Sequence, residues 1–358
     1  MQEASARLVL YANMNDEALV SAGIKLKQYV ASCSKGGLPC NITRDFDETF
    51  HPYYFNCFKY LTAPSMTAAA DGGNSGDEGV PWLMPGLDNG LSVVVLTGSG
   101  MLDKNKGVVE VLIPGLYDAG GAAAGSDGVR VVIHPPDVTP IQLAEGFDVP
   151  PGFTASLSVR PRRNERIGPP HGNCIDKDPF VSRPLLYRQL TCQQRCLQEF
   201  VRKHCGCTDE SLPMDHLDID AIHPCRHIDF PLQCSDAPDD VGPCVDALMR
   251  WYERLKCSKR MRRRLQATPA EYKHCQAQCR PACNELVYDV TYSMARWPAP
   301  GFEGDAVYED IFNVNRFMDN FGDSETVRRH FNETGDRAKA LQDFARINVY
   351  MADAEVSK

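Results

Sequence analysis

Cysteines are concentrated in one part of this sequence, between residues 174 and 283, which holds twelve of the fifteen. Cys192 and Cys196 fall in a stretch whose leucines and valines recur at helical spacing, so a helix would place both on one face. Cys275 and Cys279 form a matching pair in a stretch that begins with a Thr-Pro-Ala-Glu capping pattern and stops at a proline. The sequence therefore predicts two helices that each present a pair of cysteines.

Antiparallel helices with cysteines at these spacings can be cross-linked only in crossed order. The expected pairs, all of which join the two arms of one hairpin, are Cys192–Cys279, Cys196–Cys275 and, at the base, Cys174–Cys283. A metal cluster is the alternative, but the nearby histidines do not recur at the spacing of zinc ligands. Disulfides are favoured, and they indicate an oxidising compartment.

The length and charge of the chain narrow the possible classes of protein. With 358 residues it is long enough to bury a core, so disulfides would add to that core without replacing it. A net charge of −9 argues against nucleic acid as a partner. Neither a signal peptide nor a run of about 20 apolar residues is visible, so we expect the chain to be part of a longer exported protein.

Features outside the cysteine block also suit an extracellular protein. Asn41 and Asn332 each begin an Asn-x-Thr sequon for N-linked glycosylation. Cys33 and Cys40 enclose a short loop that suits a local disulfide. The odd number of cysteines predicts that one of them lacks a partner in this chain.

Hydrophobic patterning predicts an α+β architecture in which strands flank a helical insertion. Phe153, Ala155, Leu157 and Val159 alternate with polar residues, as in a strand with one buried face. The predicted strands are 53–61, 91–97, 107–113, 129–134, 153–160, 286–294 and 345–353. Outside the cysteine block we expect helices at 16–31 and 324–331, and a surface loop at 62–90.

No set of residues in the sequence points to catalysis or to a cofactor. Gly322-Asp323-Ser324 is similar to the start of a serine-hydrolase motif, but this pattern is more typical of a turn followed by a helix cap. Gly98-Ser99-Gly100 lacks the rest of a phosphate-binding loop. We therefore expect no enzymatic activity and no cofactor.

Two basic runs, 160–166 and 259–264, are expected to be solvated faces. The second lies between Cys257 and the cap of the next helix, so we expect an exposed loop there. Arg260, Arg262 and Arg263 form an Arg-x-Arg-Arg pattern that suits furin-like proteases, and exposed loops are where nicking concentrates. A cleavage site and a merely solvated loop are the two alternatives for this run.

The order of motifs along nearly the whole chain resembles the extracellular region of the degenerin, epithelial sodium channel and acid-sensing ion channel superfamily. The C-x3-C-x3-C spacing of Cys275, Cys279 and Cys283 is closer to epithelial-type subunits. The motifs are, in order, Cys33-x6-Cys40, YFNCFKY around Cys57, Asn89-Gly90-Leu91, VVIHPP (131–136), VPPGFTASLSV (149–159), PPHGNC (169–174), TCQQRC (191–196), HCGC (204–207), CQAQCRPAC (275–283) and YSMARWP (292–298).

The resemblance implies a hand-like fold with a β-sheet palm, a β-ball, a finger, a knuckle and a disulfide-stapled helical thumb. The implied parts are a partial finger at 1–52, palm and β-ball at 53–173 with the loop at 62–90, the cysteine-rich thumb at 174–283, a palm strand at 284–300, the knuckle region at 301–343 and a returning palm strand at 344–358.

The resemblance also implies a function. The chain would be the sensing and gating region of a trimeric, amiloride-sensitive-type sodium channel subunit, on the extracellular side of the plasma membrane. Its partners would be other channel subunits, in a homotrimer or heterotrimer, and sodium ions that pass through the full-length pore. The family's two membrane-spanning helices are absent from this chain. A secreted disulfide-rich binding protein is the alternative.

Several residue roles rest on the resemblance alone. The cysteine that matches Cys57 pairs in the family with one upstream of this chain's start, so we expect Cys57 to be unpaired here. His171 stands where the family usually has an aromatic residue that touches the first spanning helix, so its role in membrane coupling is open. The implied pairs among the remaining cysteines are Cys205–Cys244 and Cys207–Cys225, which leaves Cys234–Cys257.

Overall fold

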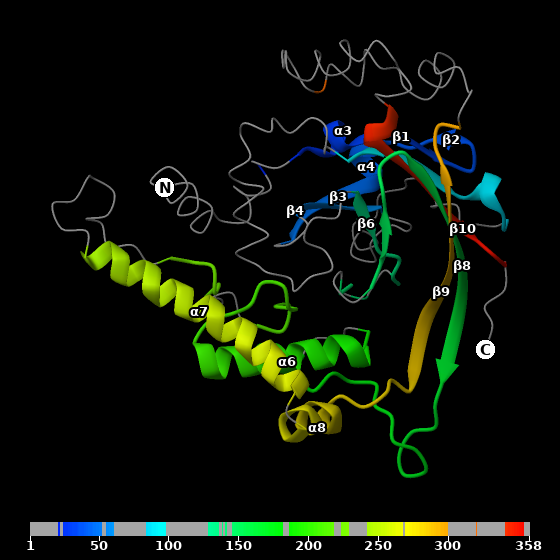
Figure 1. Cartoon of the computed structure of the whole chain (residues 1–358). Coiled ribbons are helices and arrows are strands. Elements are labelled where there is room, and N and C mark those ends of the chain that lie inside the picture. Colours follow the sequence, from blue (N-terminus) through cyan, green and yellow to red (C-terminus); the bar gives the residue numbers. More distant parts are fainter. Residues whose placement is uncertain are drawn as a thin grey trace, which may run out of the picture.

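The structure, a computed structural model, combines a six-stranded mixed sheet with a separate unit of three helices (Figure 1). This arrangement agrees with the α+β class predicted from the sequence. The residues that the structure describes are 21, 24–51, 55–60, 84–97, 128–135, 138, 140–141, 145–181, 186–217, 223–228, 242–267, 269–299, 320 and 341–353.

The sheet brings strands from both ends of the chain together. Its order is β2-β1-β5-β10-β8-β9, and every neighbouring pair is antiparallel except β10 and β8, which are parallel. In chain order the strands are β1 (Val30–Lys35), β2 (Leu38–Pro39), β5 (Leu91–Leu96), β8 (Phe153–Glu165), β9 (Asn284–Arg296) and β10 (Phe344–Met351). The last strand of the chain therefore lies near the middle of the sheet.

One face of this sheet forms the first core. In β8, Ala155, Leu157 and Val159 are buried, as the alternating pattern predicts, and Ala345 and Ile347 of β10 belong to the same core. Small hydroxyl residues occupy the intervening positions of β8. The two faces of the strand therefore differ in polarity, and this difference fixes the register because a slip by one residue would expose the apolar set.

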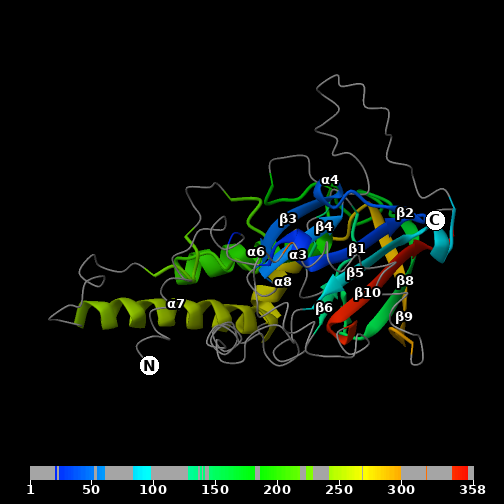
Figure 2. The same cartoon turned by 90° about the horizontal axis from the view of Figure 1, so that it is seen from above.

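Two strand pairs and short helical turns contribute to this core. The pairs are β3 (Phe46–His51) with β4 (Phe55–Tyr60) and β6 (Val129–Val131) with β7 (Phe147–Val149), and the short helices are α3 (Leu26–Tyr29) and α4 (Ile42–Asp45). Two further turns, η2 (Leu87–Asn89) and η7 (Leu341–Asp343), precede β5 and β10. The Phe46 and Tyr60 rings meet edge to face at 5.1 Å, and the Tyr29 and Phe58 rings lie 4.8 Å apart. Figure 2 shows β3, β4, α3 and α4 beside β1 and β5.

The helix predicted over 16–31 is wrong at its C-terminal end. In the described part, α3 ends at Tyr29 and Val30 begins β1, whose residues pair with β5 from Val30↔Val95 to Lys35↔Leu91. Pairing with a neighbouring strand overrides the weak helical pattern here. The strand predicted at 107–113, the helix predicted at 324–331 and most of the loop 62–90 lie outside the described residues.

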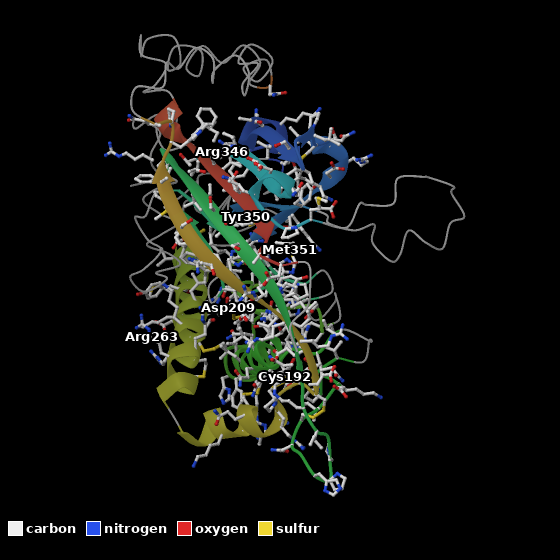
Figure 3. The ribbon with its side chains drawn as sticks, turned by 90° about the vertical axis from the view of Figure 1, so that its right-hand side faces the viewer. Cys192, Asp209, Arg263, Arg346, Tyr350 and Met351 are labelled. Atoms are coloured by element: carbon white, nitrogen blue, oxygen red, sulfur yellow. A yellow bond between two sulfur atoms is a disulfide. The ribbon has the colours of Figure 1, made fainter. Side chains whose placement is uncertain are left out.

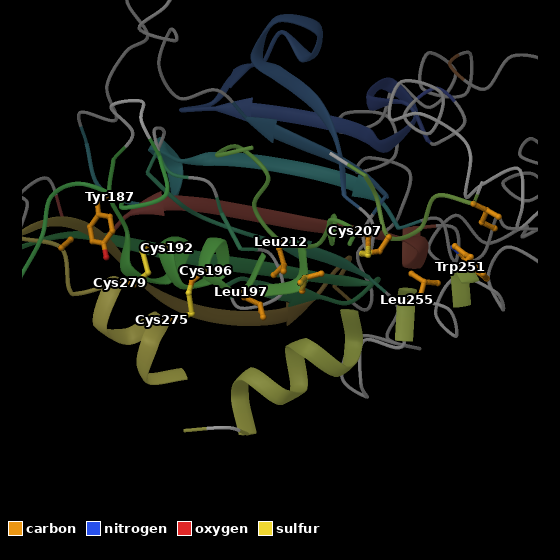
Figure 4. Close-up of a cluster of buried hydrophobic side chains, with 14 residues drawn as sticks. Tyr187, Cys192, Cys196, Leu197, Cys207, Leu212, Trp251, Leu255, Cys275 and Cys279 are labelled. Atoms are coloured by element: carbon orange, nitrogen blue, oxygen red, sulfur yellow. A yellow bond between two sulfur atoms is a disulfide. The ribbon is translucent and has the colours of Figure 1, made fainter. Parts of the chain in front are cut away.

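A second core lies within the helical unit, which consists of α6 (Gln189–Cys205), α7 (Gly242–Ala267) and α8 (Pro269–Gln278). Figure 4 shows its side chains, among them Tyr187, Leu197, Trp251 and Leu255, gathered around the disulfides. α6 ends at Gly206, whose φ of 65° is the left-handed conformation that terminates many helices.

The helical unit is attached to the sheet by a long ribbon. β8 and β9 pair over thirteen residues, from Phe153↔Arg296 to Glu165↔Asn284, which corresponds to about 40 Å. Figure 1 shows the ribbon running from the sheet toward α8. The chain enters and leaves the helical unit at the same end of this ribbon.

Gly90 is required by a close approach of two backbones. A Cβ at this position would lie 2.4 Å from the carbonyl oxygen of Val349 and 2.7 Å from the Cβ of Tyr350. We expect Gly90→Ala to lower the free energy of unfolding by about 1–3 kcal/mol, because β5 and β10 would have to separate. Urea denaturation monitored by tryptophan fluorescence measures this.

Gly168→Ala is the matched control. Its added Cβ would meet only the sulfur of Cys283, at 3.9 Å, which is ordinary contact. We expect a change within about 0.5 kcal/mol. Equal losses in the two variants would contradict the close approach at Gly90.

Candidate functional site

The helical unit is cross-linked along its length. Cys192 is bonded to Cys279 and Cys196 to Cys275, in the crossed order expected for antiparallel helices. All four cysteines are buried, and Figure 4 shows both bonds between α6 and the segment formed by α8 and Cys279 just after it. The relative position of these two segments is therefore fixed covalently at two successive turns of α6.

A third disulfide, Cys174–Cys283, closes the base of the unit. Beside it, the backbone of Ile175 donates to Pro281 at 3.0 Å and accepts from Cys283 at 3.2 Å. Together with the bridge Ile175↔Ala282, these bonds hold the entering and leaving chains side by side. The base therefore holds both arms of the unit together at the end of the ribbon.

The pairing implied for Cys205 is corrected by the structure. Cys205 is bonded to Cys257, with a Cα–Cα distance of 5.8 Å, and not to Cys244. A helix rises about 1.5 Å per residue, so Cys244 lies roughly 20 Å from Cys257 along α7, out of disulfide reach of the end of α6. Cys234–Cys257 is excluded by the same bond; Cys244 is also disulfide-bonded, and Cys234 lies outside the described residues.

The remaining local pairs agree with expectation. Cys207 is bonded to Cys225, and Cys33 to Cys40 across the β1–β2 hairpin. The described residues contain no cluster of His, Cys, Asp and Glu side chains suited to a metal ion.

The basic run 259–264 is not a loop, because α7 continues through it to Ala267. Arg262 turns inward and its Nη1 donates to the Ser211 hydroxyl at 2.8 Å, while Arg260 and Arg263 are exposed on the outer side. Figure 3 shows Arg263 on the side of α7 that faces away from the sheet. A protease would have to unwind the helix to reach this run. The exposed loop on which the cleavage hypothesis was based is therefore not present.

A buried ion-pair cluster lies under α6. Arg195 donates through Nη1 to Asp178 at 2.6 Å and through Nε to Asp215 at 2.9 Å. The side chains of Arg195 and Asp178 are each only 3% exposed. Removing one partner of such a pair typically costs about 3–5 kcal/mol, so the cluster fixes the segment before α6 and the one after it against the helix.

Asp209 forms a second polar centre between α6 and α7, and Figure 3 shows it between the sheet and the stapled helices. Its carboxylate accepts from the hydroxyls of Ser211 and Ser258, each at 2.6 Å, and its backbone exchanges two hydrogen bonds with Gln198. Burial alone would raise the pKa of Asp209, but Arg262 and the two serines outweigh it and hold the pKa below its usual value. The charged carboxylate therefore ties α7 to α6 through polar contacts.

The junction between the sheet side and the helical unit depends on Glu145 and Arg188. Arg188 is the residue at the N-terminal boundary of α6, and two of its nitrogens donate to the Glu145 carboxylate, one of them at 3.2 Å. Glu145 also accepts from the backbone N–H of Ile141 at 3.1 Å. Partial burial favours a higher pKa of Glu145, yet the bonds from Arg188 and Ile141 leave it below its ordinary value. This contact joins the segment before β7 to the start of α6.

The loop at the base of the ribbon is tightly folded. Arg166 donates to the carbonyl of Ala282 at 2.7 Å, and a Cβ at Gly172 would lie 1.7 Å from the carbonyl oxygen of Ile167. His171 is exposed within this loop. Its contact with a membrane-spanning helix stays a prediction.

Other sequence-predicted residues lie away from the helical unit. Asn41 is exposed at the start of α4 and its side chain accepts from the backbone of Arg44, whereas Asn332 lies outside the described residues. Cys57 is a free cysteine on β4, and burial raises its pKa to about 11, so it is a poor nucleophile near neutral pH.

Sequence reasoning missed the charged contacts that hold the unit in place. A signal was present for Arg195, because it lies next to Cys196 on the same buried face of α6 as Cys192. A cation on an otherwise buried helix face indicates acidic partners nearby. No comparable pattern singles out Glu145 or Asp209.

The Glu145–Arg188 contact predicts a pH-dependent loss of stability. Because the pKa of Glu145 is lowered from 4.5, its contribution is present above about pH 4.5 and disappears as the pH falls through the folded-state value. We expect Glu145→Gln to cost about 1 kcal/mol near neutral pH and clearly less near pH 3. Urea denaturation at both pH values measures the difference.

Asp353→Asn provides the control, since its ion pair with Arg160 is more than half exposed on both sides. We expect no measurable change at either pH. A Glu145→Gln loss that persisted undiminished at acid pH would show that the ion pair is not its source.

No helix among the described residues is long and apolar enough to cross a bilayer. Comparison with protein families matches residues 5–358 to the model described as amiloride-sensitive sodium channel. The match covers nearly the entire chain.

Individual relatives agree with this match. The degenerin-like protein unc-105 of Caenorhabditis elegans is 24% identical over 290 residues, which cover 80% of this chain and 27% of the relative. The epithelial sodium channel subunit beta of Bos taurus is 26% identical over 301 residues, or 82% of this chain and 38% of the relative. The FMRFamide-activated amiloride-sensitive sodium channel of Cornu aspersum is 27% identical over 203 residues, or 57% of this chain and 29% of that channel.

The chain thus spans less than two fifths of the length of these curated relatives. The family match, the relatives and the order of disulfide-bonded motifs agree with one another. On this evidence the chain belongs to the amiloride-sensitive sodium channel family, which is a family of ion channels and not of enzymes.

Proposed function

We propose that this chain is the extracellular sensing and gating region of a sodium channel subunit of the amiloride-sensitive type. The observation that carries the proposal is the attachment of a covalently braced helical unit to the end of a thirteen-residue ribbon. Sodium conduction, amiloride block and assembly into a homotrimer or heterotrimer belong to the whole channel and form part of the proposal.

Within this proposal the parts of a hand-like extracellular region are assigned along the chain. The helical unit, 174–283, is the thumb. The remaining parts are a partial finger at 1–52, palm and β-ball at 53–173, a palm strand at 284–300, the knuckle region at 301–343 and the returning palm strand at 344–358. The position of β10 between β5 and β8 supports the last assignment.

The proposed mechanism treats the thumb as a rigid lever. Three disulfides prevent the two arms of the thumb from sliding past one another. They are the base bond Cys174–Cys283 and the two bonds on α6, Cys192–Cys279 and Cys196–Cys275, which we call the rungs. The contact of Arg188 with Glu145 couples the base of the thumb to the sheet side, because Tyr187 contacts Arg280 next to the base bond. The loop that carries His171 lies at the same base. A movement of the outer parts would reach the membrane side through this loop.

Other residue assignments follow from the same proposal. Cys57 would pair with a cysteine from a preceding part of the full-length subunit, and Asn41 and Asn332 would carry glycans on the outer face of the plasma membrane. Neither a cofactor nor nucleic acid is part of the mechanism.

Expression of the full-length subunit in oocytes tests the function. We expect an inward sodium current that amiloride blocks, either constitutive or evoked by acid, peptide, shear or protease. The FMRFamide-activated relative is one reason to include peptides among the stimuli. Recovery of the protein in the medium without any current would favour a secreted binding protein and reject the channel proposal.

Removal of one rung tests the lever. The bond Cys196–Cys275 closes a separation of 79 residues, for which loop-closure entropy alone gives about 4–5 kcal/mol. Since bonds with separations of 87 and 109 residues enclose almost the same loop, we expect Cys196→Ser with Cys275→Ser to cost much less. Surface expression should persist while the current falls or its kinetics change, as measured by surface biotinylation and voltage clamp.

Cys33→Ser with Cys40→Ser is the control, because this bond closes only a local hairpin with a separation of 7 residues. We expect its current to match the wild type at equal surface density. If the rung variant fails to reach the surface although both neighbouring bonds remain, the rungs serve folding and the lever mechanism is wrong.

A further inference from the structure

The solvent-facing side of α7 carries an exposed line of apolar side chains. Val245, Met249 and Tyr252 follow one another at helical spacing and are 50%, 55% and 53% exposed. Isolated exposed apolar residues are common, but three in one line on one helix are unusual for a free surface. An exposed apolar line of this kind is typical of a surface that binds another molecule.

The same line continues into a cationic half. Lys256, Arg260 and Arg263 are exposed at the next positions of the same helix face, and the Lys256 ammonium lies 5.5 Å from the centre of the Tyr252 ring. We call these six residues the α7 strip. It extends over about 27 Å, with an apolar half followed by a basic half.

The opposite side of α7 is already occupied within the chain. Ala247, Trp251, Leu255 and Ser258 are buried there, against α6 and the segments that follow it. α7 has 26 residues and α6 only 17, and Figures 1 and 2 show the N-terminal half of α7 extending past α6. Among the residues that the structure describes, the α7 strip is exposed along its length, while the opposite face of the helix is buried.

The charge of α7 is opposite to that of the chain. Its 26 residues include eight Lys and Arg against two acidic residues, in a chain with a net charge of −9. Such a local excess of cations on an acidic protein favours association with an anionic partner.

We propose that the α7 strip is a docking surface for an acidic peptide segment that also carries apolar side chains, supplied by a partner protein. The apolar half would be buried by the apolar side chains of that segment, and the basic half would pair with its carboxylates. A sulfated polysaccharide would use only the cations. A membrane surface would favour cations along the edges of the apolar face, whereas here they follow it along the axis.

A pair of synthetic peptides tests the proposal with the complete 358-residue chain. The probe is a fluorescein-labelled helical peptide with leucines along one end of a face and glutamates along the other, and its partner has lysines in place of the glutamates. Fluorescence anisotropy should show binding of the acidic peptide, weakened by added salt, and no binding of the basic one.

Variants locate the surface. Met249→Ser and Arg260→Glu should each weaken binding of the acidic peptide by about tenfold, because both halves of the strip contribute. Arg250→Glu is the matched control: it makes the same charge change on an exposed position of α7 that lies about 120° around the helix. Its binding should equal that of the wild type. Near-UV circular dichroism checks that every variant stays folded.

Three results would overturn the proposal. The first is no binding of the acidic peptide to the wild-type chain, and the second is equal weakening by Arg250→Glu and Arg260→Glu. The third is tight binding of heparin or anionic vesicles that Arg260→Glu abolishes, together with no effect of Met249→Ser on any probe. That result would assign the basic half to a polysaccharide or a lipid surface.

Discussion

The continuous pairing of β8 with β9 is the constraint on which the rest of the molecule depends. One strand of the ribbon belongs to the central sheet through its parallel contact with β10, and the ribbon leads directly to Cys174 and Cys283. Because the two strands of the ribbon stay paired without a break over thirteen residues, the helical unit cannot rotate on a single flexible linker. Its orientation relative to the sheet is set by backbone hydrogen bonds, and the Glu145–Arg188 contact adds a second point of attachment.

Charge inside the helical unit is arranged to hold segments that lack regular structure. The segments on either side of α6 contribute Asp178, Asp209 and Asp215, and each carboxylate meets an arginine from a helix. These contacts are costly to leave incomplete, so they specify one arrangement of the connections around α6. The disulfides limit how far the segments before and after α6 can move from the helices. The ion pairs fix the position of these segments against the helices.

Much of this architecture could be predicted from sequence, because the relevant signals are local. The alternation of apolar and polar residues in β8 shows which face of that strand is buried. In the same way, the i, i+4 spacing of Cys192 and Cys196 shows which face of α6 carries the disulfides. α7 was missed although Ala247, Trp251 and Leu255 recur every four residues, since the basic run after them is typical of a loop. β1 was missed because small polar residues weaken its alternation. The partners of Arg195 are 17 and 20 residues away and lie in irregular segments, so no periodicity could identify them.

The central place of β10 has a consequence for the order in which the chain acquires its structure during synthesis. The helical unit is complete in residues 174–283 and can close its disulfides once that stretch has left the ribosome. The sheet cannot be completed then, because β5 and β8 are joined only through a strand made of residues 344–351. Until residues 344–351 have been synthesised, the edges of β5 and β8 that pair with β10 stay open, which is the condition under which unfinished sheets associate with other chains or with chaperones.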